Sequence, residues 1–165
     1  MFAQAPSILR SLLLSSGLLL AFGAFPLSAQ SANMTFFITD EGMPGVADAE
    51  DRFFLGDSFC HHQAYAAGFG DLEWRAYLDG PDPGGEGAVR GGDRIGSGPW
   101  HNFQGTLIAS DVEELHSDAA NLTPSTVLTA RGSRAPSDAP AIPSGPELAG
   151  ASFSLDRPFL CFASD

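Results

Sequence analysis

The stretch Pro158 to Ala163 reads PFLCFA, and the fold of the chain depends on it. A compact apolar run of this length is typical of a buried strand. It contains Cys161, and the only other cysteine is Cys60. Two cysteines in an oxidising compartment pair far more often than they stay free, and a bond that closes a loop of about 100 residues removes about 4 to 5 kcal/mol of unfolded-chain entropy. We therefore predict a Cys60–Cys161 disulfide that ties the last strand to the first helix.

The first 29 residues have the pattern of a secretory signal peptide. Arg10 precedes the apolar run Ser11 to Phe25 (SLLLSSGLLLAFGAF), and small residues follow up to Ala29. The run is shorter than the about 20 apolar residues that a membrane-spanning helix needs. We expect residues 30–165 to form one mature domain without a membrane span. We expect this domain to be secreted or periplasmic.

The chain is strongly acidic. It holds 20 Asp and Glu residues against 8 Lys and Arg, and its formal net charge is −12. Every cation is an arginine. Such a surface repels phosphate backbones and anionic lipids, so nucleic acid and anionic membrane are poor partners.

Apolar spacing predicts a small set of helices and strands around the disulfide. Helical spacing begins after Asp57 or Ser58, which are both suitable N-caps, and continues to Ala67. A second short helix follows a cap at Ser110 or Asp111. Strands are predicted over residues 34–39, 72–78, 105–109 and 158–163. In the second of these strands, alternation places four side chains on one buried face: Leu72, Trp74, Ala76 and Leu78.

Two segments rich in turn-forming residues are predicted to be loops. Residues 79–92 (DGPDPGGEGAVRGG) are one of them. Residues 117–151 are depleted in large apolar side chains, and Gly132 to Gly150 is predicted to be a mobile loop rich in Pro, Ser and Gly. The order of elements indicates an α+β fold with small mixed or antiparallel sheets, two helices and chain ends that lie close together.

Several motifs between Gly45 and His116 occur in a fixed order. They are AAG at 66–68, WRAYL at 74–78, DRIGSGPW at 93–100 and VEELH at 112–116, and FLCFA follows at 159–163. Together they resemble a family of exported bacterial lectin-like proteins with the C-type-lectin fold. They are more distantly similar to the collagen C-terminal domains that include endostatin. The resemblance implies a C-type-lectin-like domain over residues 30–165, a fold that hosts sugar, protein and ice binding as well as some enzymes.

The chain departs from this family between the second helix and the last strand. The relatives carry a long segment there, with two further cysteines and loops rich in Trp and Asn. In the C-type-lectin fold this region supplies calcium and sugar ligands. Gly132 to Gly150 (GSRAPSDAPAIPSGPELAG) stands in its place here, so we expect a shortened long-loop region.

Five residues are the predicted ligand-contact surface. Trp100 follows a proline and offers an aromatic face that stacks on a sugar or fills a partner's pocket, although it can equally be a core plug. His101 and Asn102 are its neighbours, and Asp79 and Asp82 lie in the glycine-rich loop. Calcium takes about six to eight oxygen ligands, and the acidic residues of this loop match no known calcium-loop pattern. The acidic side chains of this loop still make calcium a candidate ion, and no other cofactor is predicted.

The sequence contains no complete catalytic constellation. His61 and His62 are neighbours that point about 100° apart on a helix, which prevents them from sharing a metal easily. His116 with Glu113 supplies two ligands, too few for a structural metal site. Ser97, in Gly-Ser-Gly, lacks the spacing of a nucleophile elbow.

These observations predict a secreted or periplasmic, non-enzymatic binding module. It recognises a glycan or a protein surface at the cell envelope or matrix. Two alternatives stay open: a metal-assisted or carboxylate-based hydrolase on the same fold, and a degenerate scaffold that has lost its ligand site. Convergence of histidines and carboxylates on one point would favour the metal enzyme.

Overall fold

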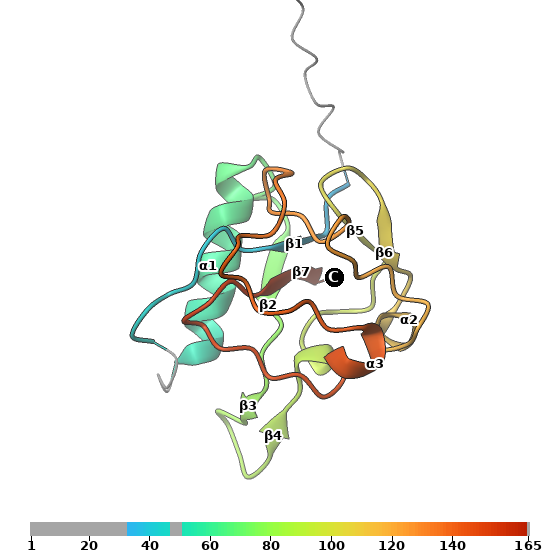
Figure 1. Ribbon diagram of the computed structural model, residues 1–165. Coiled ribbons are helices and arrows are strands. Elements are labelled where there is room, and N and C mark those ends of the chain that lie inside the picture. Colours follow the sequence, from blue (N-terminus) through green and yellow to red (C-terminus); the bar gives the residue numbers. More distant parts are fainter. Residues whose placement is uncertain (1–32, 47–50, 165) are drawn as a thin grey trace, which may run out of the picture.

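The computed structural model describes residues 33–46 and 51–164 (Figure 1). The predicted signal peptide, residues 1–29, lies outside these ranges. Three strands form the main sheet, namely β1 (Phe36–Ile38), β2 (Glu73–Ala76) and β7 (Leu160–Ser164). β7 is the central strand and pairs antiparallel with both neighbours. Segments from the two ends of the described chain therefore lie side by side.

Side chains alternate along β7, and both faces of the sheet are apolar. Cys161 lies on one face, where Phe37 is its direct neighbour on β1 and makes an edge contact with Trp74, with ring centroids 4.9 Å apart. Phe162 lies on the other face and contacts Trp100, with ring centroids 5.3 Å apart. A strand that is covered on both faces requires a continuous apolar run, which explains the sequence of the last strand.

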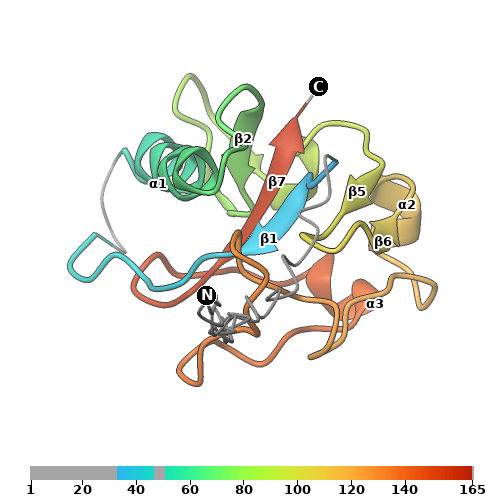
Figure 2. The ribbon, with the colours of Figure 1, turned by 90° about the horizontal axis from the view of Figure 1, so that it is seen from above.

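Helix α1 (Arg52–Ala66) covers the face of the sheet that holds Cys161 (Figure 2). Its buried residues are small and four positions apart: Gly56, Cys60 and Ala64. Cys60 is bonded to Cys161, with the two Cα atoms 5.7 Å apart, so the predicted disulfide is confirmed. A Cβ atom at Gly56 would lie 2.9 Å from the Cβ of Ala76, and the glycine therefore allows helix and strand to approach closely.

The start of α1 differs from the prediction. The helix begins at Arg52, with Asp51 at the N-cap position but without a capping hydrogen bond from its side chain, and Asp57 and Ser58 lie within the helix. The Asp57 carboxylate accepts the backbone N–H of Ala76 on β2 instead of capping its own helix. A tertiary contact has thus replaced the local capping role, which the helical spacing does not reveal.

The segment of residues 100–116 covers the opposite face of the sheet (Figure 2). Strands β5 (Trp100–His101) and β6 (Leu107–Ala109) form an antiparallel pair, and α2 (Val112–Leu115) follows. The predicted cap of α2 is confirmed, because the Asp111 side chain accepts the N–H of Glu114. Helix α3 (Gly145–Leu148) packs against α2.

The two predicted loops contain regular structure. Residues 79–92 include the hairpin of β3 (Gly80–Pro81) and β4 (Ala88–Val89) and the beginning of the 3₁₀ helix η1 (Gly91–Asp93). The segment 132–150 contains α3, whose Leu148 is fully buried. The described residues therefore form three α-helices, not two. Such short elements depend on tertiary contacts, and turn-rich composition hides them.

The fold is α+β with small antiparallel sheets, and its buried apolar residues form one cluster. One predicted member of that cluster is wrong. Leu72 precedes β2 and is 38% exposed, whereas Trp74, Ala76 and Leu78 are buried as predicted.

No helix within residues 33–46 and 51–164 has the length and apolar character needed to cross a membrane. The disulfide indicates an oxidising, non-cytoplasmic environment.

Candidate functional site

The structure buries two of the five predicted contact residues, Trp100 and Asn102. Trp100 is fully buried, and its indole N–H donates to the carbonyl of Ala163. Asn102 is also fully buried, and its side-chain oxygen accepts backbone N–H groups of the turn between β5 and β6. His101 and Asp79 are half-exposed, and Asp82 is exposed. The core-plug alternative therefore describes Trp100, and its role as a contact residue is corrected.

Asp79 and Asp82 serve local structure. Asp79 accepts the backbone N–H of Gly91 at 2.7 Å, and Asp82 accepts that of Gly84 at 2.9 Å. Both carboxylates thus stabilise the hairpin segment. In the described parts of the chain, three or more His, Cys, Asp or Glu side chains nowhere gather into a metal-binding group.

A groove of about 900 Å³ lies between α1, β2 and the β3–β4 hairpin. Phe54, Ser58 and His61 line it from α1. They share one face of the helix because they are spaced three or four positions apart. The segment that enters β2 forms the facing wall, and Pro83 and Val89 of the hairpin close one end. The remaining lining residues are Asp51, Phe53, Asp57, Gly70, Asp71, Leu72, Glu73, Trp74, Arg75 and Arg94.

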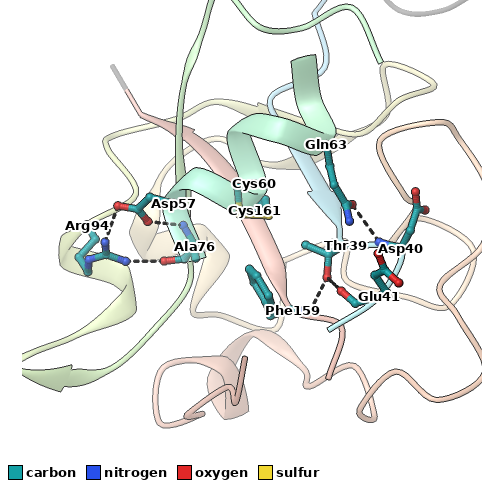
Figure 3. Close-up of a disulfide and its surroundings, with 10 residues drawn as sticks. All are labelled: Thr39, Asp40, Glu41, Asp57, Cys60, Gln63, Ala76, Arg94, Phe159 and Cys161. Atoms are coloured by element: carbon teal, nitrogen blue, oxygen red, sulfur yellow. Dashed lines mark hydrogen bonds and ion pairs between the residues drawn. A yellow bond between two sulfur atoms is a disulfide. The ribbon is translucent and has the colours of Figure 1, made fainter. Parts of the chain in front are cut away.

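An ion cluster joins the two walls of this groove. The Asp57 carboxylate, on α1, accepts hydrogen bonds from Arg75 at 2.9 Å, from Arg94 at 2.7 Å and from the backbone N–H of Ala76 at 2.9 Å. Arg94 also donates to the Ala76 carbonyl at 2.6 Å (Figure 3). The guanidinium of Arg94 lies 4.2 Å from the ring centroid of Phe53, a cation–π distance. Helix, strand and loop are therefore held by one carboxylate.

The same cluster closes the outer edge of the sheet at Ala76. The N–H of Tyr77 bonds to β7, so alternation directs the N–H and carbonyl of Ala76 away from the sheet. Asp57 and Arg94 bind those two groups and take the place of a neighbouring strand. The pair is deeply buried, since the side chains of Asp57 and Arg94 are 13% and 12% exposed.

Electrostatics keep Arg75 charged. The hydrogen bond that Arg75 donates to Asp57 raises the pKa of Arg75 against the lowering effect of burial, and the charges of Asp57 and Glu73 act in the same direction as the hydrogen bond. Arg75 also forms a surface ion pair with Glu73. Each arginine is thus already bound to acidic partners of its own chain.

The groove also exposes apolar side chains. Phe54 is 72% exposed and Leu72 is 38% exposed, one on each wall. Below them, the Trp74 ring is buried, and its N–H donates to the Phe69 carbonyl. Large apolar side chains exposed beside a hollow are typical of a contact surface for a partner.

A second polar pair lies on the far side of the sheet. The Tyr77 hydroxyl contacts His116 Nε2 at 2.8 Å and donates to the Leu148 carbonyl at 3.1 Å. A phenol has one proton, so Nε2 of His116 is the donor in the first contact. Burial raises the pKa of Tyr77, and Asp79 and Asp93 add to the rise. Burial lowers the pKa of His116, with Asp93 acting in opposition. The pair joins the residues that directly follow β2 and α2 to α3, and we interpret it as structural.

Comparisons with family models, with curated proteins and with solved structures return no match. The C-type-lectin resemblance therefore stays a prediction from the motifs.

Sequence reasoning missed the groove. His61 is exposed, and its neighbours in the groove come from residues 51–58, 70–75 and 83–94. Leu72 was predicted to face the core and Phe54 precedes the predicted helix, so neither residue was a signal for the groove. The ion cluster had no signal either, because its three members are far apart along the chain.

We predict that Asp57→Asn destabilises the protein by about 2 to 3 kcal/mol, because it leaves two arginines near a partner that no longer carries charge. Chemical denaturation of the oxidised protein measures the effect. Asp71→Asn removes the same charge from an exposed position of the groove and is expected to change stability by less than about 0.5 kcal/mol. Equal stability of the two variants would contradict this role of Asp57.

We also predict a pH effect from His116. Its folded-state pKa lies below the unfolded-state value, so its stability contribution is complete above the unfolded-state pKa and is lost as the pH falls through the folded-state pKa. His116→Gln keeps a donor for Tyr77 but does not titrate. The free energy of unfolding of wild type should therefore fall more steeply than that of the variant between neutral and mildly acidic pH. Parallel curves from denaturant titrations at each pH would refute it.

Proposed function

We propose that this protein is an exported, non-enzymatic binding module and that the groove between α1 and β2 is its ligand-binding surface. The disulfide and the signal-like first 29 residues support export to the periplasm or the cell exterior. The observation that carries the proposal is the pair of exposed apolar side chains, Phe54 and Leu72, on opposite walls of one hollow.

The groove suits a segment of another protein better than a glycan. A sugar presents many hydroxyl groups, and each one that is buried needs a polar partner. The most buried polar groups of the groove, Asp57 and Arg94, are already bonded to each other. An apolar side chain placed between Phe54 and Leu72 needs no such partner and gains by leaving water. We therefore propose an extracellular protein segment as the ligand.

No specific observation favours the hydrolase alternative. Asp57 is the buried carboxylate of the groove, and it is already bound by two arginines and a backbone N–H. The histidines do not converge with carboxylates within the described residues. The lectin-like identity and a contact with glycans at the cell envelope remain proposals that rest on the sequence motifs.

A displayed library of random dodecapeptides, selected on the immobilised oxidised protein, tests the proposal. We predict enrichment of peptides with an apolar anchor. Their affinity should fall at least about tenfold in Phe54→Ala, because this variant loses the phenyl ring that the bound peptide covers. Tyr65→Ala is the matched control. Tyr65 lies on the same helix with 70% exposure and does not line the groove, so this variant should bind almost as wild type does.

A glycan array probed with the same variants covers the alternative. Glycan binding that depends on Phe54, without any enriched peptide, would replace the protein ligand with a sugar. Absence of both kinds of Phe54-dependent binding would overturn the proposed function and leave the degenerate scaffold.

A further inference from the structure

The charges around the groove are unbalanced. Its lining includes four acidic residues and two arginines. Asp51 and Asp71 are exposed, and no arginine of the described chain lies within ion-pair distance of them. Glu73 pairs with Arg75 at the rim, and its side chain is 58% exposed. The rim therefore presents acidic oxygens to solvent around an apolar centre.

The two arginines of the groove do not offset this field for a ligand. Arg94 donates to Asp57 and to the Ala76 carbonyl, and Phe53 lies against its guanidinium. Arg75 is bound by Asp57 and Glu73. An anionic ligand would have to compete with these carboxylates, whereas a cationic ligand meets Asp51 and Asp71 without competition.

We propose that the partner is a basic protein segment, in which an apolar side chain sits between Phe54 and Leu72 and flanking Lys or Arg side chains meet Asp51, Asp71 and Glu73. This inference rests on the proposed function and adds the charge of the ligand to it. Opposite charges at a rim increase association rate and selectivity, and an apolar centre supplies most of the affinity.

A second copy of the chain does not fit this description. The chain contains 20 acidic residues, 8 arginines and no lysine, with a net charge of −12. Two such surfaces repel each other at low ionic strength. The groove therefore favours a partner of opposite charge over self-association.

The test is the composition of the dodecapeptides selected on the wild-type protein and on two charge variants. The first is Asp71→Asn/Glu73→Gln, which removes two charges from the rim. The second is Glu113→Gln/Asp118→Asn, which removes two charges from exposed positions at and just beyond α2, outside the groove. Both variants have the same net charge, so non-specific attraction of basic peptides by an acidic protein affects them equally.

We expect peptides selected on wild type to be enriched in Lys and Arg beside an apolar anchor. Their affinity should fall about threefold to tenfold in the rim variant and stay within about twofold in the control variant. Raising the salt concentration should weaken binding to wild type more than binding to the rim variant.

Each other outcome has a definite meaning. Enriched peptides that depend on Phe54 but are neutral or acidic would overturn the basic partner and leave the binding groove standing. Basic peptides that lose equal affinity in both charge variants would overturn it as well, because their attraction would then be non-specific. Failure of every Phe54-dependent selection would overturn the proposed function itself.

Discussion

The bond between Cys60 and Cys161 joins the middle of α1 to the central strand of the sheet, and the other contacts of the fold are arranged around it. Because β7 pairs with both β1 and β2, this bond fixes the helix against all three strands. On one side of it, Gln63 of α1 accepts the backbone N–H of Asp40 (Figure 3). On the other side, Asp57 binds β2. The helix is therefore held by one covalent bond and by polar contacts on both sides of it.

The groove is a consequence of this arrangement. α1 lies close to β2 at Gly56 and Ala76, and no element of the described chain covers the helix face that carries Phe54 and His61. Asp57 then has two roles, since it closes the sheet edge and it binds both arginines of the groove. What remains exposed is an apolar centre with an acidic rim, which is the basis of the proposed function and of the basic partner.

Elements with strong local signals were predictable from the sequence, and elements built by tertiary contacts were not. The apolar run around Cys161 and the cap at Asp111 were recognisable, because a continuous apolar stretch and an N-cap are local patterns. Asp57 shows the opposite case: it is a good capping residue by type, yet its carboxylate binds a strand and two arginines. Trp100 shows that a large aromatic residue beside a turn can be a core plug. The groove required the same long-range information.

The most direct test of the central claim is native-state hydrogen exchange at the amides of Tyr77 and Ala163, which bond across the two sides of β7. The account predicts that both exchange only through global unfolding in the oxidised protein. In the variant Cys60→Ala/Cys161→Ala, the free energy of that opening should fall by about 4 to 5 kcal/mol, the loop-closure contribution of a bond across about 100 residues. Unchanged protection of both amides in the variant would contradict the claim that this bond holds the helix and sheet together.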